Sequence, residues 1–139
     1  MERYIVDTNV LVQIVTEQGF TEYVNYTLNY SGAQIYVSSA SVQEFINLLQ
    51  GEDVKLEKQK MVSVQNVFEF IEDTLGFIVK YVDKGHLKQL CKMDVINKHT
   101  DPFDRIIIAQ AILEEIPLIS SDKLFPKYRK IGLDFIPNY

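Results

Sequence analysis

The sequence predicts an α/β fold, a three-layer sandwich in which a mainly parallel sheet of four or five strands carries helices on both faces. Short β-prone runs alternate with stretches of helical periodicity, which is the order of elements that parallel strands and crossover helices require. The chain has 139 residues and 47% apolar composition, enough to bury a full core without disulfides or a structural metal. We therefore expect one domain over residues 1–139.

Charge and composition exclude several classes of protein. A net charge of −5 argues against a protein that coats nucleic acid, although residues 80–139, with 10 basic and 8 acidic side chains, still allow a basic rim. The single cysteine, Cys91, excludes an internal disulfide and a cysteine-based zinc site, and we expect it in the core. His86 and His99 are too few for a histidine zinc site and are expected to be structural or surface residues. No membrane span or signal-peptide pattern occurs, so we expect a cytoplasmic protein.

The first elements are a strand, a polar turn and two helices. Residues 3–6 are β-prone, Asp7 falls at their carboxyl end, and Asn9 is suited to cap the following helix. A second helix is predicted by the spacing within 20–30. Its aromatic side chains fit either the core or a surface for a partner; they are Phe20, Tyr23, Tyr26 and Tyr30.

The middle of the chain continues the alternation. The capping-box spacing of Ser41 and Glu44 predicts the start of a helix. Around it, patterning predicts a strand at 35–37, a polar loop at 51–59, a long helix at 64–75, a strand at 77–82 and a helix at 84–96. In the last of these, one face carries Lys84, Lys88 and Lys92, either as a solvated row or as phosphate contacts.

Residues 99–111 contain the element around which the fold is organised. Asp101 suits a helix N-cap, Pro102 suits the first helical position, and Asp104 falls at the third, where an acid favours the helix dipole. The isoleucines and alanines that follow leave no polar stripe wide enough for a surface helix, so we expect this helix to be central.

Four carboxylates fall where the predicted sheet and its helices meet solvent. The carboxyl ends of parallel strands lie at one edge of a sheet, where ligand sites form. A further strand is predicted at 117–119 and an edge strand at 133–136. Two of the acids follow the strands predicted at 3–6 and 117–119, and the other two lie in the first turn of a helix. The four are Asp7, Glu44, Asp104 and Asp122.

Carboxylates gathered in this way repel one another, so the cluster must take up protons or bind a cation. Oxygen ligands without histidine or cysteine partners select hard ions, Mg²⁺ or Mn²⁺. Such ions activate water and stabilise the leaving oxygen of a phosphodiester. The chemistry predicted is hydrolysis of nucleic acid or of another phosphate ester.

Four segments of the chain resemble the sequence blocks of PIN-domain nucleases. The resemblance implies a PIN-like fold, which is similar to the Rossmann fold. The blocks are Tyr4–Leu11, Ser41–Glu44, His99–Ala111 and Leu118–Asp122, in the family's order. They are most similar to the toxin ribonucleases of type II toxin-antitoxin pairs, the virulence-associated protein C group. This resemblance implies a metal-dependent endoribonuclease that acts on RNA, forms a homodimer and is covered by an antitoxin.

The resemblance also assigns roles to individual residues. Asp7, Glu44, Asp104 and Asp122 match the catalytic, metal-binding acids of the family. Asn9 matches its supporting polar residue, and Ser120 stands where the family usually has threonine. Arg105 and Lys123 lie beside these acids and are candidates for phosphate contacts, although solvated or salt-bridged roles fit them equally.

Other functions fit the sequence less well. Aspartyl-phosphate hydrolases need a second acid two residues after the first, where this chain has Asn9. Phosphoacceptor signalling domains need an acid at the end of a central strand, and Asp83 is a poor substitute. A catalytically silent PIN-like interaction module would have lost acids that this chain keeps. A PIN nuclease outside a toxin-antitoxin pair, acting on other RNA or on DNA, remains open.

Overall fold

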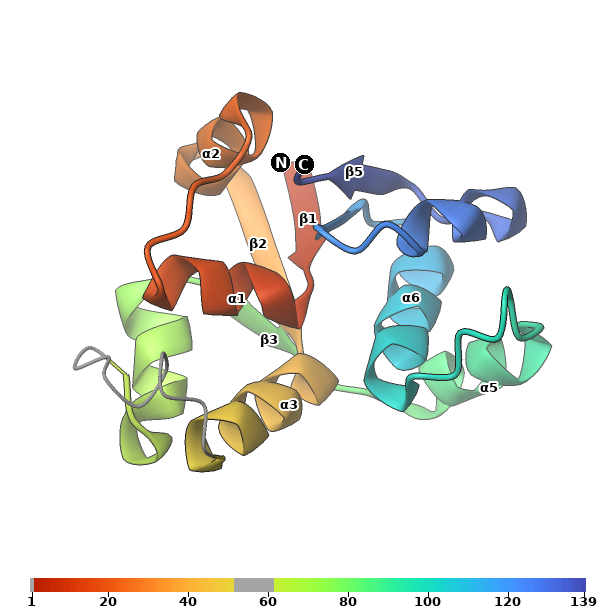
Figure 1. The fold of residues 1–139 in the computed structure, drawn as a ribbon, viewed down its shortest axis with the longest axis horizontal. Coiled ribbons are helices and arrows are strands. Elements are labelled where there is room, and N and C mark those ends of the chain that lie inside the picture. Colours follow the sequence, from red (N-terminus) through yellow and green to blue (C-terminus); the bar gives the residue numbers. More distant parts are fainter. Residues whose placement is uncertain (1, 52–61) are drawn as a thin grey trace.

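A five-stranded sheet forms the centre of the computed structural model, which describes residues 2–51 and 62–139 (Figure 1). All neighbouring strands are parallel, in the order β3-β2-β1-β4-β5. The strands are β1 (Glu2–Val6), β2 (Ala33–Ser38), β3 (Ile78–Lys80), β4 (Leu118–Ser120) and β5 (Phe135–Pro137). The predicted α/β sandwich is confirmed, and the sheet is wholly parallel.

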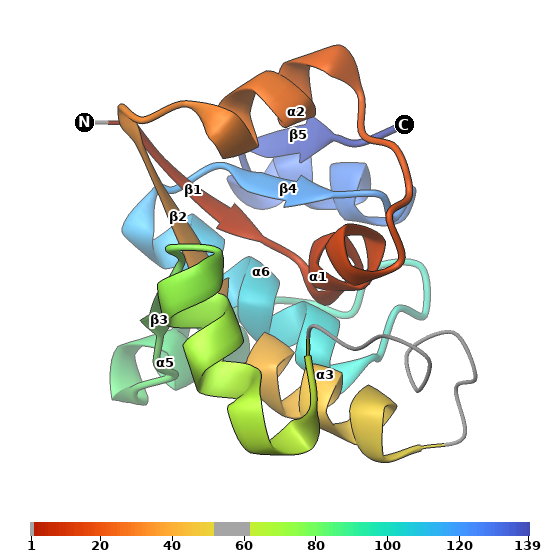
Figure 2. The ribbon, with the colours of Figure 1, turned by 90° about the vertical axis from the view of Figure 1, so that its left-hand side faces the viewer.

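Helices cover both faces of this sheet. Figure 1, in which the sheet separates the two layers, shows α1 and α2 on one side and α5 and α6 on the other, and Figure 2 shows the turned view. The α-helices are α1 (Thr8–Val15), α2 (Glu22–Asn29), α3 (Ser39–Gln50), α5 (Lys84–Lys92) and α6 (Pro102–Glu114). The 3₁₀ and π segments are η1 (Val64–Asn66), η2 (Glu69–Thr74) and η3 (Phe125–Ile131).

Two apolar clusters fill the space between the layers. Because successive side chains of a strand point to opposite faces, Tyr4 and Val6 pack in one cluster and Ile5 packs in the other. The helix α6 is central as predicted, since Ile107 and Ile108 are completely buried. This burial anchors the first turn of α6 at the edge of the sheet.

Strand β1 fixes the position of the site because it has a partner on each side. It pairs with β2 over its whole length and with β4 near its end. The backbone N–H of Asp7 donates to the carbonyl of Ile119 at 3.0 Å. The residues that follow β1 and β4 are therefore held next to each other.

The structure corrects the predicted helix starts. The N-cap of α1 is Asp7, whose side chain accepts from the Thr8 backbone, so the cap predicted at Asn9 is wrong. The N-cap of α3 is Ser38, because Ser38 Oγ accepts from the backbone of Ala40, and the predicted Ser41 capping box does not form. Both helices therefore begin directly at the end of a strand.

The long helix predicted at 64–75 is instead the succession of η1 and η2, a 3₁₀ turn followed by a π segment. Its apolar side chains Val67, Phe70 and Ile71 are nevertheless buried in the core. The polar loop predicted at 51–59 lies, apart from Gly51, outside the described residues.

The structure corrects one expectation about burial and decides between two alternatives at another place. Cys91 is exposed on α5 instead of lying in the core. The tyrosines on α2 and at its C-cap do not lie in the core, because 56%, 65% and 41% of their surface is exposed; they are Tyr23, Tyr26 and Tyr30. Among the described residues, no helix has the length and apolar character needed to cross a membrane.

Candidate active site

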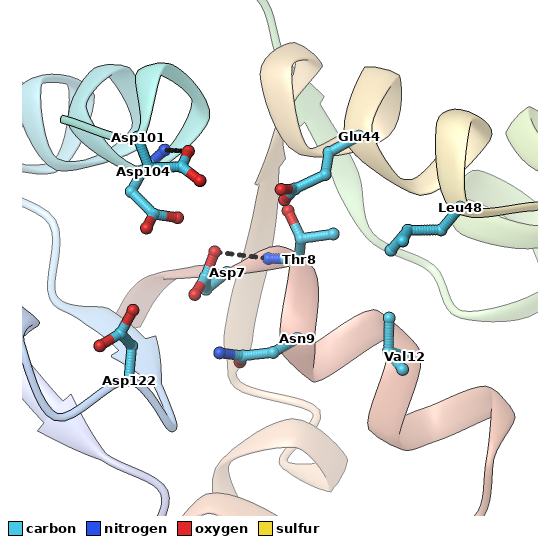
Figure 3. A pocket seen from close by; sticks show the side chains of 9 residues that line it. All are labelled: Asp7, Thr8, Asn9, Val12, Glu44, Leu48, Asp101, Asp104 and Asp122. Atoms are coloured by element: carbon cyan, nitrogen blue, oxygen red, sulfur yellow. Dashed lines mark hydrogen bonds between the residues drawn. The ribbon is translucent and has the colours of Figure 1, made fainter. Parts of the chain in front are cut away.

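A cavity of about 310 Å³ opens where the ends of β1 and β4 meet the first turns of α3 and α6 (Figure 3). Its lining includes five carboxylates from four segments of the chain: Asp7, Glu44, Asp101, Asp104 and Asp122. In Figure 3 the carboxyl groups of Asp7, Asp104 and Asp122 point toward the same space. The structure therefore brings together the four acids that the sequence singled out.

Asp7 is the most enclosed of these acids, with 4% of its surface exposed. Its Oδ1 accepts from the Thr8 backbone at 2.7 Å, and its Oδ2 accepts from Ser120 Oγ at 2.8 Å. Burial raises the pKa of Asp7 to about 7, and the charge of Asp104 adds to the rise, while the two hydrogen bonds oppose it. This carboxylate thus lies where a positive charge would be strongly favoured.

Ser120 connects Asp7 to the rest of the site. Its buried hydroxyl accepts from the backbone N–H of Asp122 at 3.0 Å and from Asn9 Nδ2 at 3.3 Å. Asn9 Oδ1 in turn accepts from the backbone of Ser121 at 3.5 Å. Asn9 and Ser120 thus hold the ends of β1 and β4 together, and the supporting role predicted for them at a metal site stays a prediction.

Asp104 stands in the first turn of α6, where Asp101 is the N-cap. Asp101 Oδ1 accepts from the backbones of Phe103 and Asp104 at 3.0 and 3.1 Å, so the predicted cap is confirmed. Burial raises the pKa of Asp104 to about 6; a hydrogen bond from His99 opposes the rise, and the charges of Asp101 and Asp122 add to it.

The remaining two acids lie on the rim of the cavity. Asp122 is half-buried, and its Oδ1 accepts from the backbone of Leu124 at 2.8 Å. Glu44, also half-buried on α3, points toward Thr8 in Figure 3. Thr8 Oγ1 is buried without a hydrogen-bond partner among the described residues and lines the same cavity.

The two candidate phosphate contacts lie elsewhere. Among the described residues, neither Arg105 nor Lys123 lines the cavity. The guanidinium of Arg105 donates from Nη2 to the carbonyl of Met93 at 2.9 Å. Lys123 is exposed, and its Nζ lies 5.4 Å from the centre of the Tyr139 ring. Their contact with phosphate stays a prediction.

The sequence analysis missed the involvement of His99 in this region. His99 is buried, and its Nε2 lies 2.9 Å from Asp104 Oδ2. One ligand atom each from His99, Asp104 and Asp122 all lie within 4.8 Å of one another. The one signal in the sequence was the position of His99, five residues before Asp104 and two before the helix N-cap Asp101.

The donor set suits a hard divalent cation. Carboxylate oxygens are the ligands that Mg²⁺ and Mn²⁺ prefer. Burial first, and neighbouring acids second, raise the pKa values of Asp7 and Asp104, so a bound cation would favour their ionised forms. The unpaired Thr8 hydroxyl offers a further oxygen on the same wall. The residues present therefore fit the predicted metal.

Solved structures share this fold. A structure of VapBC2 from Rickettsia felis bound to a promoter DNA fragment aligns with a TM-score of 0.73 at 16% identity, covering 97% of this chain and 98% of the other. DNA-bound VapBC from Salmonella typhimurium gives a TM-score of 0.68 at 16% identity, with 99% and 98% covered. FitAcB from Neisseria gonorrhoeae gives 0.64 at 16% identity, with 96% of each chain covered.

The comparison with sequences adds the family. No curated protein matches this chain. The family model described as PIN domain matches residues 4–131, a range that contains all four predicted acids. Together with the parallel sheet and the acid-lined cavity, this match shows that the chain belongs to the PIN domain family.

Proposed function

We propose that this protein is a metal-dependent endoribonuclease that hydrolyses RNA phosphodiesters. One observation carries the proposal: four acids from four distant segments line a single cavity, and they are Asp7, Glu44, Asp104 and Asp122. The PIN domain match supports the same reading. The N-cap role of Asp7 accounts for the position of that one acid, but it does not account for the convergence of all four acids on one cavity.

The four carboxylates are the residues that would hold Mg²⁺ or Mn²⁺. When bound, such an ion lowers the pKa of water and stabilises the leaving oxygen of an in-line displacement. The chain's own part is to keep the acids oriented before substrate arrives. Ser120 and the Thr8 backbone fix Asp7, and the Asp101 cap fixes the turn that carries Asp104.

We further propose that the protein is the toxin of a type II toxin-antitoxin pair, acting in the cytoplasm as a homodimer. The solved structures of similar fold support this role, since one is described as a toxin-antitoxin complex from Klebsiella pneumoniae. A surface for the antitoxin is offered by α2, where the rings of Tyr26 and Tyr30 stack with centroids 5.7 Å apart and both are exposed. Large exposed aromatic groups of this kind are typical of protein interfaces.

Cleavage of an RNA pool tests the activity. Purified protein is incubated with mixed structured and single-stranded RNA in Mn²⁺, Mg²⁺ or EDTA, beside Asp104→Asn and the control Asp73→Asn, which changes an exposed acid on η2. We expect cleavage that needs metal and Asp104 but not Asp73. A cation-binding protein that cleaves DNA and not RNA would favour a PIN nuclease of another kind, and a protein that binds no cation would favour an interaction module.

A further inference from the structure

His99 lies behind Asp104, enclosed by aromatic side chains. It is 7% exposed, in the loop between α5 and α6. Its ring centroid lies 5.6 Å from that of Tyr128 and 6.0 Å from that of Phe125. Tyr128 and Phe125, both on η3, are completely buried. The imidazole is therefore held on two sides by rigid neighbours.

Both ring nitrogens of His99 have partners. Nε2 lies 2.9 Å from Asp104 Oδ2, and Nδ1 lies 2.8 Å from the hydroxyl oxygen of Tyr128. An ionised carboxylate only accepts hydrogen bonds, so we assign the proton to Nε2. Nδ1 of the neutral ring then accepts from the Tyr128 hydroxyl. One tautomer thus satisfies both contacts.

The lining of the cavity indicates that His99 is a positioning residue and not a metal ligand. Asp104 and Asp122 line the cavity, whereas His99 is not among the described residues that do. His99 contacts Oδ2 of Asp104, so Oδ1 of the same carboxylate stays available to the cavity. Histidine Nε2 is occupied by this hydrogen bond and Nδ1 by Tyr128. His99 is thus placed to hold an acid and not to bind a cation itself.

We propose that His99, locked by Tyr128, is a positioning residue that fixes the carboxylate of Asp104 for cation binding. The inference rests on the proposed metal-dependent function. A carboxylate on a short side chain rotates freely unless a second group holds it, and the partners that hold metal ligands typically contribute about 10- to 100-fold to metal affinity. The hydrogen bond replaces that freedom by a single orientation before any cation arrives.

Calorimetric titration with Mn²⁺ and with Mg²⁺ tests this role without requiring cleavage. His99→Leu removes the donor, and we expect the Kd for both ions to rise about 10- to 100-fold. Tyr128→Phe removes only the hydroxyl that fixes the ring, and we expect a smaller rise. His99→Gln returns an amide N–H at the position of Nε2, and we expect it to restore most of the affinity.

His86→Leu is the matched control. His86 is also buried, and its Nε2 contacts the carboxylate of Glu114, at the opposite end of α6 from Asp104. We expect this variant to lose thermal stability and to keep the wild-type Kd for both ions. A ¹⁵N spectrum of the metal-free wild type adds an independent signature, the His99 ring protonated at Nε2.

Three results would overturn the inference in distinguishable ways. A folded His99→Leu protein with the wild-type Kd would show that His99 does not position Asp104. A loss of Mn²⁺ affinity with unchanged Mg²⁺ affinity would make His99 a ligand, since nitrogen donors favour the softer ion. Wild-type protein that binds neither ion would remove the proposed function itself, and this inference with it.

Discussion

Ser120 Oγ donates a hydrogen bond to Asp7 Oδ2 at 2.8 Å, joining the end of β4 to the end of β1. The same hydroxyl accepts from the backbone of Asp122, so one buried atom contacts two of the four proposed metal ligands. Ser120 therefore sets the spacing of the acids that follow the two strands.

Replacing this hydroxyl tests its contribution to stability. Ser120→Ala leaves the Asp122 N–H without its acceptor and Asp7 Oδ2 without its donor, so we expect a loss of about 1–3 kcal/mol in the free energy of unfolding. Urea unfolding at neutral pH measures it. Ser31→Ala, which changes an exposed serine, is the control, and equal stability of the two variants would contradict the expectation.

The raised pKa of Asp7 predicts how the stability of the metal-free protein depends on pH. Its pKa is about 7 in the folded protein and near the ordinary value of 3.8 in the unfolded chain, so the folded state binds the proton more tightly. The stabilisation is complete below the unfolded pKa and is lost as pH rises through about 7. We expect the free energy of unfolding to fall by about 2 kcal/mol between about pH 5.5 and pH 8.

Urea unfolding in EDTA across this pH range provides the measurement. Asp7→Asn cannot titrate, so its curve should be flatter than that of the wild type. A wild-type stability that rises over the same range, or an equal slope in Asp7→Asn, would count against the raised pKa.

Asp7→Asn is also expected to separate activity from folding. The substitution removes a buried charge that repels Asp104 and keeps a side-chain oxygen for the Thr8 backbone, so stability at pH 8 should be unchanged or higher by about 1 kcal/mol. Cleavage of RNA should be abolished. Thermal unfolding and the cleavage assay, run on the same preparation, give both values. Loss of folding with retained cleavage per folded molecule would return Asp7 to a purely capping role.

Binding of a metal ion should offset the loss of folding stability that the buried, ionised acids cause in the metal-free protein. A ligand that binds only the folded state at 100 times its Kd stabilises by about 2.7 kcal/mol. We expect Mg²⁺ or Mn²⁺ to raise the Tm at pH 8, EDTA to reverse the change, and Asp104→Asn to show a much smaller rise. An equal rise in Asp104→Asn would place the cation elsewhere.

The lysine row on α5 is expected to be a solvated face. Lys84, Lys88 and Lys92 are all exposed, and α5 packs on α6 on the side away from α1 in Figure 1. Replacing the three by glutamine should leave the salt dependence of RNA binding unchanged. If they contacted phosphates of single-stranded RNA, the slope of log K against log salt would fall by roughly 0.7 for each contact.

The order of the elements and the convergence of the acids could be predicted from the sequence, because both follow from local patterns. Asp7 follows β1 directly and Asp122 lies two residues after β4, and parallel strands must end at one edge. Asp101 was correctly predicted as a cap because its partners are its own neighbours along the chain.

What could not be predicted depends on packing between distant segments. The burial of His99 depends on Tyr128, whose position no local pattern fixes. Likewise, the N-cap of α3 is Ser38 and not the predicted Ser41, because β2 ends at the residue directly before the helix. Ser41 is completely buried within the helix. The tyrosines of α2 share helical spacing with core residues, so spacing alone did not show that they face outward.

The strand order also determines when the catalytic cavity becomes complete during synthesis. Asp7 lies near the start of the chain, but β1 finds its second neighbour, β4, only after more than a hundred further residues have been made. Until then Asp122 is missing from the wall of the cavity, and Asp7 lacks its hydrogen bond from Ser120. A nascent chain therefore lacks the full set of acids until β4 has been made, and we expect the proposed activity to arise only after that point.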